Sequence, residues 1–410
     1  MGFSFLRQLI PQKFINLVWH LPQAVLANVV YGFPSRKLTV IGITGTSGKT
    51  TTTHLIYHLL KTAGFKVALV SSVAAKIGDK RVDIGLHVTN PEPWLLQKLL
   101  KKIADQGLTH VVLEVTSHGL DQHRTWGINF AYGLIINLRH EHLDYHQTIT
   151  SYHAAKLKLV KAAKVAVLNS ADQSYAAAKK IARGQVLSFK PQTKLAAANL
   201  LGDFNQENIA AAAAVAQDLG VKAAAVNQAL KSFPGIPGRM ELVYQKDFTV
   251  VVDFAHKPDA LERALQAIKA LKGGSGRTIA VFGCAGLRDR LKRPQMGEIA
   301  AKLADVTILT AEDPRTEDVN TIITAIAQGA LAAGAKEVSL KAGYPKKAAH
   351  VFIRQPDRQA AINLAVHIAK PGDWVGLFGK SHEKSMCFGT IEYAWDEFAA
   401  VKKALKKRQP

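Results

Sequence analysis

The residues 42–52, GITGTSGKTTT, join a short β-branched run to a helical pattern. Residues 37–44 predict a buried strand, and Leu55, Leu59 and Leu60 fall on one side of a helix predicted over 50–62. A glycine-rich turn between a strand and a helix is typical of a phosphate-binding loop, because its backbone N–H groups can converge on phosphate oxygens. We therefore expect a nucleotide-binding α/β domain.

The loop offers a group for each part of a bound nucleotide triphosphate. Lys49 supplies positive charge to the outer phosphates, and the Thr50 hydroxyl suits Mg²⁺. Strict Walker spacing would place a glycine at position 43, where this chain has Ile43, so the loop is a variant. The expected ATP-binding residues of the loop are Gly45, Thr46, Ser47, Gly48, Lys49, Thr50 and Thr51.

The rest of the chain alternates between strand and helix patterns. Buried strands are predicted at 66–72, 109–116, 131–138 and 164–170, and an alanine-rich helix at 205–218. Two prolines and two glycines within 233–241 predict a domain joint, after which strand patterns resume at 248–254, 277–283, 305–310 and 373–378. We expect an α/β fold with mostly parallel sheets: an N-terminal segment (1–36), a central ATPase domain (37–236) and a Rossmann-like domain (237–410).

Charge and cysteine content narrow the class of protein. The chain has 53 Lys and Arg against 31 Asp and Glu, a net charge of +22 that favours anionic partners, although a generally basic surface has the same composition. Basic residues are not interleaved with aromatic ones, so no specific nucleic-acid partner is expected. Its 2 cysteines form neither a disulfide framework nor a zinc cluster, and a reducing cytoplasm is the simplest location.

The first 36 residues are apolar but interrupted. Pro22 predicts a break between two short helices, roughly 11–20 and 22–31, and Asn16 and Asn28 argue against a clean membrane span. The segment lacks the cleavage site of a signal peptide. It is expected either to pack on the body of the protein or to make peripheral contact with the inner face of the membrane.

Eight ordered segments between residues 37 and 400 give the chain a specific resemblance. They are EVTSHGLDQHR, NLRHEHLDYH, YHAAK, GDFNQEN, PGRME, VDFAHKPDAL, GCAGLRDRLKRPQMG and GKSHE. Together with the variant loop, they resemble the Mur ligases, and among these the MurE type. The resemblance implies an ATP- and Mg²⁺-dependent ligase of peptidoglycan biosynthesis, which joins an amino acid to the D-Glu of a muramyl dipeptide through an acyl phosphate.

The resemblance also implies a catalytic and metal-binding set. It consists of Lys49, Thr50, Glu114, His142 and Lys156, with Lys156 carrying a carbamate that would serve as an oxygen ligand. Without the resemblance, Glu114 reads as a solvated strand-end carboxylate, His142 as part of a polar histidine-rich surface, and Lys156 as an exposed helical lysine.

Three further sets follow from the same resemblance. Asn208, Arg239, Asp253 and His256 are expected to contact ATP, and Thr89, Thr116, Gln122 and Arg124 the muramyl-peptide acceptor. The incoming amino acid is expected to meet Arg288, Glu312, Asp313, Arg315, Gly379 and Glu383. Where diaminopimelate-adding members carry Asp-Asn-Pro-Arg, residues 312–315 read Glu-Asp-Pro-Arg. The extra carboxylate could favour lysine as the incoming amino acid. The two arginines Arg288 and Arg315 favour diaminopimelate, and we therefore expect diaminopimelate, with lysine as the alternative.

Other departures keep alternatives open. Thr116 replaces a serine of the family pattern, and Ser381 replaces a glycine. Family members carry a UDP-binding domain of about 100 residues before the loop, whereas 41 residues precede Gly42 here. We therefore expect no full UDP-binding domain, and a lipid-linked or other non-UDP acceptor, as in MurT-like ligases, is an alternative. Folylpolyglutamate or cyanophycin synthetase, a non-catalytic nucleotide-binding regulator and a nucleic-acid-binding ATPase are the remaining ones.

Overall fold

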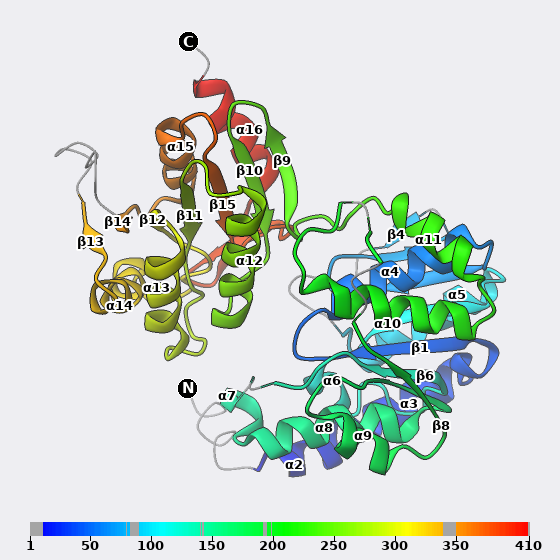
Figure 1. The fold of residues 1–410 in the computed structure, drawn as a ribbon. Helices are drawn as coiled ribbons and strands as arrows, with labels where there is room; N and C mark the ends of the chain where they lie inside the picture. Colours follow the sequence, from blue (N-terminus) through cyan, green and yellow to red (C-terminus); the bar gives the residue numbers. More distant parts are fainter. Residues whose placement is uncertain are drawn as a thin grey trace. The chain divides into compact units, whose positions relative to one another are not determined.

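A computed structural model describes residues 11–78, 80–82, 90–139, 141, 143–191, 195–197, 199–338 and 350–408. Its contacts divide the chain into two compact units (Figure 1). The N-terminal unit comprises Met1–Ala198 and Asn205–Pro234, and the C-terminal unit comprises Asn199–Phe204 and Gly235–Pro410. A short segment before α10 (Asn205–Asp218) thus belongs to the C-terminal unit, where Leu201 and Phe204 pack against the core.

The N-terminal unit is built on an eight-stranded sheet of order β4-β3-β2-β5-β1-β6-β7-β8. Six of its strands are parallel, and β3 and β4 form an antiparallel edge. The strands are β1 (Thr39–Thr44), β2 (Val67–Val70), β3 (Ala75–Ile77), β4 (Lys80–Val82), β5 (His110–Glu114), β6 (Phe130–Ile135), β7 (Val165–Asn169) and β8 (Gln185–Phe189). The expected mostly parallel sheet is confirmed, with β1 and the loop that follows it near its centre.

Helices cover this sheet with apolar faces. They are α4 (Lys49–Thr62), α5 (Pro93–Asp105), α6 (Ser117–Asp121), α7 (Leu143–His146), α8 (Ile149–Ala162), α9 (Tyr175–Ile181), α10 and α11 (Ala223–Lys231). Leu55, Leu59 and Leu60 of α4 are buried, as their spacing predicts. In β1, a Cβ on Gly42 would lie 2.6 Å from the Phe130 ring, so close packing requires a glycine there.

The C-terminal unit contains a seven-stranded sheet of order β13-β14-β12-β11-β15-β10-β9, in which only β9 is antiparallel among the described strands. Its strands are β9 (Glu241–Gln245), β10 (Thr249–Asp253), β11 (Thr278–Phe282), β12 (Val306–Leu309), β13 (Lys336–Glu337), β14 (Val351–Arg354) and β15 (Trp374–Phe378). A separate hairpin joins β16 (Ser385–Phe388) to β17 (Ile391–Ala394).

Two hydrophobic cores lie on the two faces of this sheet. One contains residues of α12 (Pro258–Leu271), α13 (Lys292–Leu303) and α14 (Val319–Ala332), and the other contains residues of α15 (Arg358–Ile368) and α16 (Glu397–Arg408). Arg358 and Glu397 form a fully buried ion pair that joins α15 to α16. Helices on both faces of a largely parallel sheet are the expected Rossmann-like arrangement.

The N-terminal segment corrects one expectation. Residues Gln12–Tyr31 form one continuous helix, in which α2 (Gln12–Ile15), the π-helical turn η1 (Asn16–His20) and α3 (Leu21–Tyr31) follow directly on one another. The break expected at Pro22 is wrong. A π turn lies just before the proline, and such a local widening of the helix accommodates a proline ring and its missing N–H. The helix ends at Gly32, whose φ is 68°, and the short helix η2 (Pro34–Lys37) leads into β1.

Candidate active site

The phosphate loop lies between β1 and α4, and its two glycines have different tasks. Gly48 has a φ of 82°, and a Cβ there would lie 2.1 Å from Oδ1 of Asn208 on α10. Both conformation and space therefore require glycine at this position. Gly45 does not have a positive φ, and its constraint is the nearby Ile136 side chain, whose Cβ would lie 3.2 Å from an added Cβ.

Asn137, which sequence analysis did not assign to the site, holds the loop in shape. Its backbone carbonyl accepts a hydrogen bond from Thr46 N at 2.9 Å, and its side-chain Oδ1 accepts one from Ser47 N at 3.1 Å. Its Nδ2 donates to Glu207 on α10 at 3.0 Å. The residue opens the segment NLRHEHLDYH, so its position in that segment is the signal that could have identified it.

Lys49 folds back over the loop. Its Nζ donates to the carbonyls of Gly45 at 2.9 Å and Thr46 at 3.1 Å. The charge is thereby held over the backbone that would surround the outer phosphates of a nucleotide. Asn208, the expected nucleotide contact on α10, is buried and accepts a hydrogen bond from Thr52 at 3.1 Å.

Glu114 and Thr50 meet beside the loop. The Thr50 hydroxyl lies 3.2 and 3.1 Å from the two carboxylate oxygens of Glu114, which also accepts hydrogen bonds from the backbone N–H and hydroxyl of Ser72. Because β5 is paired with β1, Glu114 ends its strand next to the start of the loop. Ser72 was not predicted, and no motif in the sequence marks it. A carboxylate with hydroxyl groups is a donor set that suits Mg²⁺.

The structure places Lys156 in the interior rather than on an exposed helical face. Only 1% of the residue is exposed, and its Nζ donates to the Gly45 carbonyl at 2.6 Å and lies 3.3 Å from the Thr44 hydroxyl. Burial, with repulsion from Lys49, holds its pKa well below the ordinary value, although Glu114 opposes this effect. A lowered pKa increases the fraction of the amine that is uncharged, which is the form that reacts with electrophiles.

Two expected site residues cannot be placed. His142 and Thr89 lie outside the described residues. Among the residues that the structure does describe, no group of three or more His, Cys, Asp or Glu side chains is arranged to hold a metal ion. A carbamate on Lys156 would add oxygen ligands beside Glu114 and Thr50.

The expected acceptor residues gather around Asn90. The side-chain oxygen of Asn90 accepts hydrogen bonds from the backbone N–H and hydroxyl of Thr116, at 2.6 and 2.8 Å. Arg124 donates to the Asn90 carbonyl at 2.8 Å and to Gln122 at 3.0 Å, and it forms an ion pair with Glu92. The structure therefore brings together Thr116, Gln122 and Arg124, and Asn90 is a member of the cluster that sequence analysis missed.

In the C-terminal unit, the expected nucleotide residues surround Phe254. The Arg239 guanidinium lies 4.5 Å from the centre of the Phe254 ring, and the Asp253 carboxylate accepts hydrogen bonds from the backbone of Met240 and Ala255. Burial raises the pKa of Asp253 despite the charge of Arg239. Burial also lowers the pKa of His256 to about 3, so its imidazole is neutral at physiological pH.

The expected amino-acid residues surround a lysine that was not assigned. Lys380 is fully buried and forms ion pairs with Asp313 at 2.8 Å and Glu383 at 2.7 Å. Asp313 also accepts a hydrogen bond from Cys387 N at 2.9 Å. Asp313 thus shares one cation with Glu383, and the expectation that its carboxylate favours a cationic substrate stays a prediction.

The other members of this set differ in exposure. Glu312 is buried, and burial raises its pKa. Gly379 has a φ of 102°, and an added Cβ would lie 3.3 Å from the Glu312 side chain. The backbone N–H of Arg315 donates a hydrogen bond to the Cys387 carbonyl at 3.0 Å. Arg288, by contrast, is exposed.

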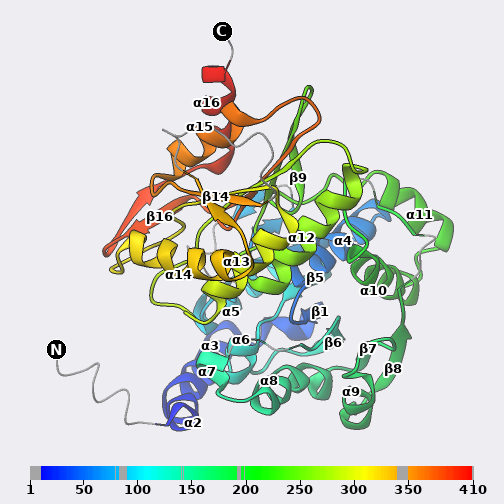
Figure 2. The same cartoon turned by 60° about the vertical axis from the view of Figure 1, so that its left-hand side comes forward.

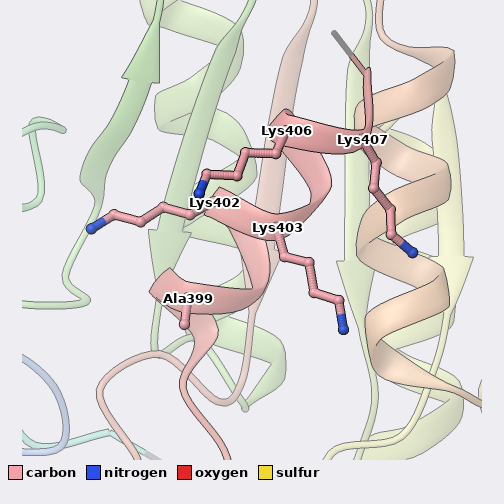
Figure 3. A pocket seen from close by; sticks show the side chains of 5 residues that line it. All are labelled: Ala399, Lys402, Lys403, Lys406 and Lys407. Carbon is pink, nitrogen blue, oxygen red and sulfur yellow. The ribbon is translucent and has the colours of Figure 1, made fainter. Parts of the chain in front are cut away.

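A strongly basic surface lies elsewhere, on α16. A shallow depression of about 420 Å³ is lined by Ala399, Lys402, Lys403, Lys406 and Lys407. Figure 3 shows Lys402 and Lys406 extending to one side of the helix and Lys403 and Lys407 to the other. The four ammonium groups do not converge on one point, which is the arrangement of a solvated basic face.

Comparison with known proteins identifies the family. Residues 43–198 match the Mur ligase middle domain, and residues 238–381 match the Mur ligase, glutamate ligase domain. UDP-N-acetylmuramoyl-L-alanyl-D-glutamate--2,6-diaminopimelate ligase from Thermosynechococcus vestitus is 38% identical over 416 residues, covering 93% of this chain and 80% of the relative. The chain belongs to the Mur ligase family. The ligase of the same name from Aquifex aeolicus is 36% identical over 405 residues, covering 92% of this chain and 80% of the relative.

Solved structures agree with this Mur ligase assignment. A UDP-N-acetylmuramoyl-L-alanyl-D-glutamate--2,6-diaminopimelate ligase matches with a TM-score of 0.60 and 30% identity, covering 91% of this chain and 79% of that one. E. coli FolC, solved with DHPP and ADP, matches with a TM-score of 0.69 at 18% identity, covering 95% and 93%. The second likeness supports the fold, while the MurE-type segments distinguish this Mur ligase from FolC.

Proposed function

We propose that this Mur ligase is a MurE-type, ATP-dependent enzyme that joins an amino acid to the D-Glu carboxyl of a muramyl dipeptide precursor. The observation that carries the proposal is the cluster at the phosphate loop. Lys49, Thr50, Glu114 and the reactive amine of Lys156 lie together around one backbone carbonyl and one buried carboxylate. The relatives named for this reaction align with 93% and 92% of this chain.

The chemistry explains why such a cluster is needed. A carboxylate is a poor electrophile, so its oxygen first attacks the γ-phosphorus of ATP, and ADP leaves. The amine then attacks the resulting acyl phosphate, phosphate leaves, and the amine loses a proton as the amide forms. The carboxylate, the nucleotide, the acyl phosphate and the released phosphate are all anionic, and Lys49 supplies fixed positive charge over the loop.

Mg²⁺ fits the donor set beside the loop. Thr50, Glu114 and a carbamate on Lys156 would hold it, with His142 as a further proposed ligand, and it would neutralise phosphate charge. The carbamate forms when the uncharged Nζ of Lys156 attacks the carbon of CO₂, an N–C bond forms and a proton is released. Burial favours this step because it lowers the pKa of the amine and so raises its uncharged fraction.

We propose diaminopimelate as the incoming amino acid. Arg315 and Arg288 can bind carboxylates, and Glu383 can accept an ammonium group beside Lys380. The relatives named above act on 2,6-diaminopimelate, which supports this choice. Lysine is the second candidate, since it carries the same distal ammonium without the second carboxylate.

We further propose that the enzyme works in the cytoplasm, with peripheral contact at the inner face of the membrane through residues 1–36. A lipid-linked muramyl-peptide acceptor is the second candidate substrate, because such a precursor would be found where the helix Gln12–Tyr31 could reach a bilayer. Thr116, Gln122 and Arg124 are proposed to hold the muramyl-peptide end in either case.

The test is phosphate release from ATP by the full chain. We would supply UDP-muramyl dipeptide with diaminopimelate, lysine or ammonium in separate reactions and identify products by mass. Turnover with diaminopimelate is the expected result. Turnover that appears only with a lipid-linked acceptor would favour the second candidate, and ATP binding without turnover on any acceptor would favour a nucleotide-binding regulator.

A further inference from the structure

The helix Gln12–Tyr31 has its polar and apolar sides reversed relative to a surface helix of a soluble protein. Its buried side carries Asn16 and Asn28, both nearly inaccessible to solvent. Its outward side carries apolar residues that are between 49% and 64% exposed. These residues form what we call the apolar face: Phe14, Leu17, Val18, Trp19, Leu26, Val29 and Val30.

The two asparagines fix the orientation of the helix. Asn16 Nδ2 donates to the Asp121 carboxylate at 2.8 Å, and Asn28 Nδ2 donates to the Trp126 carbonyl at 2.8 Å. A Cβ on Gly127 would lie 2.6 Å from the Asn28 side chain, so the contact is close as well as polar. Rotating the helix to bury the apolar face would break both hydrogen bonds, so the face points outward by construction.

The same contacts argue against a membrane-crossing helix. Gln12–Tyr31 has 20 residues and is long and apolar enough to cross a bilayer by length and composition. However, α3 packs against α5 within the N-terminal unit, and both asparagines are bonded to that unit. Figure 2 shows α2 and α3 at the periphery of the N-terminal unit. A helix held in this way can lie along a membrane surface with one side in the lipid.

The surroundings favour an anionic lipid surface as the occupant. The sequence has no Asp or Glu before Asp79, whereas Lys13, Arg36 and Lys37 flank the apolar residues in sequence and are exposed. The acidic side chains Glu92, before α5, and Asp121, at the end of α6, are paired with Arg124 and Lys158. Three of the 5 tryptophans, Trp19, Trp94 and Trp126, lie on or beside the helix and are at least 36% exposed. Tryptophan and basic side chains at an apolar surface are typical of membrane–water interfaces.

We infer that the apolar face inserts into the headgroup region of a bilayer containing anionic lipid, with the helix axis parallel to the membrane. This inference specifies the surface for the peripheral contact proposed above, but it does not require any particular acceptor. Its test therefore measures lipid binding without substrates, and ligase turnover on a soluble acceptor is measured separately.

The experiment is cosedimentation of the full chain with vesicles of phosphatidylglycerol mixed with phosphatidylcholine, and with phosphatidylcholine alone. We expect binding to the anionic vesicles that weakens as salt is raised. Leu26→Asp should lower the partition coefficient by about tenfold or more, because it removes apolar area from the lipid and places a charge there. Leu331→Asp on α14 is the matched control, since Leu331 is 48% and Leu26 is 53% exposed; it should change binding by less than about twofold.

A second measurement protects against a folding artefact. Brominated lipid should quench the fluorescence of the native chain, and Trp19→Phe should lose much of that quenching while still binding vesicles. Absence of binding to anionic vesicles would overturn the inference, as would an equal loss in Leu26→Asp and Leu331→Asp. Self-association of the full chain that Leu26→Asp abolishes, without lipid binding, would instead assign the face to a second copy of this chain.

Discussion

Two buried lysines, one in each unit, show how differently burial can act on the same side chain. Lys156 is 1% exposed and Lys380 is fully buried. Lys156 donates to a neutral carbonyl, and its pKa is lowered, whereas Lys380 lies between two carboxylates, and its pKa is raised despite the opposing effect of burial. The partner, and not the depth, decides whether a buried amine is reactive or structural.

The comparison gives the two sites different electrostatic characters. In the phosphate-loop site, the positive charge of Lys49 faces the Glu114 carboxylate, while the lowered pKa of Lys156 reduces the positive charge of its own amine. The site around Lys380 already contains its own counter-charges, Asp313 and Glu383. The site around Lys380 therefore carries more negative than positive charge before any substrate binds, whereas the phosphate-loop site would gain further negative charge from bound phosphates or a carbamate.

The largest expected effect is on turnover. Lys156→Ala should lower amide formation by about a thousandfold or more, because it removes both the reactive amine and the proposed metal ligand. Lys158→Ala is the matched control two positions along α8, where the lysine is exposed and paired with Asp121. Phosphate release measures both variants, and near-native turnover by Lys156→Ala would remove the carbamate from the mechanism.

The two lysines should also differ in their contributions to stability. Lys380→Met should lower the free energy of unfolding by about 3–5 kcal/mol, because it leaves the buried Asp313 and the half-buried Glu383 without their cation. Among the described residues, the hydrogen bonds of the Lys156 amine go to a carbonyl and a hydroxyl, so for Lys156→Met we expect little loss, within about 1 kcal/mol, or a gain. Urea unfolding measures the free energy of unfolding of both variants. Equal losses in the two variants would contradict the proposed difference between the two lysines.

The pH dependence of stability should have opposite signs. Lys156 is deprotonated in the folded state and protonated in the unfolded state between its lowered pKa and 10.5, so stability should rise with pH in that window, by up to about 1.4 kcal/mol per unit. Lys380 has a raised pKa, so its contribution is complete below 10.5 and is lost as pH rises through the folded value. Unfolding curves of the native chain and each Met variant, compared from neutral to alkaline pH under nitrogen to limit carbamate formation, would show the difference.

A smaller effect is expected from Asp313→Asn. The amide can still accept from Cys387 N, and Lys380 retains Glu383, so the free energy of unfolding should fall by only about 1–2 kcal/mol. The ratio of diaminopimelate to lysine used should stay within about threefold, because the lost charge was paired inside the protein. Competition between the two amino acids with a mass readout is the measurement, and a large swing toward diaminopimelate would show that Asp313 faces the substrate.

Much of the fold could be predicted because its signals are local. The phosphate loop, the helix 205–218 and the buried strands follow from hydrophobic runs and glycine positions, and all appear in the structure. The short antiparallel pairs β3–β4 and β16–β17 were not predicted, since their residues alternate too briefly to show a period. The continuation of the helix through Pro22 was not predicted, because a π turn leaves no sequence signature.

The residues of the candidate site also differ in whether a local sequence signal marks them. Lys49, Thr50 and Glu114 could be placed because each follows a strand or glycine turn. The role of Lys156 was expected only through resemblance to a family, and its burial was not predicted. Ser72, Asn90, Asn137 and Lys380 were missed because their partners are far away in the chain or are backbone groups. Long-range hydrogen bonds of this kind are set by tertiary packing, which single-sequence patterns do not record.

The contact between Gly48 and Asn208 determines whether the phosphate loop could be transferred to another protein on its own. Asn208 fills the space above Gly48, and it accepts a hydrogen bond from Thr52, 156 positions earlier in the chain. The region that matches the Mur ligase middle domain ends at residue 198, before α10 begins. A fragment cut at that boundary would keep every residue of the loop and lose the side chain against which the loop is shaped, so domain exchange among such ligases would have to carry α10 with it.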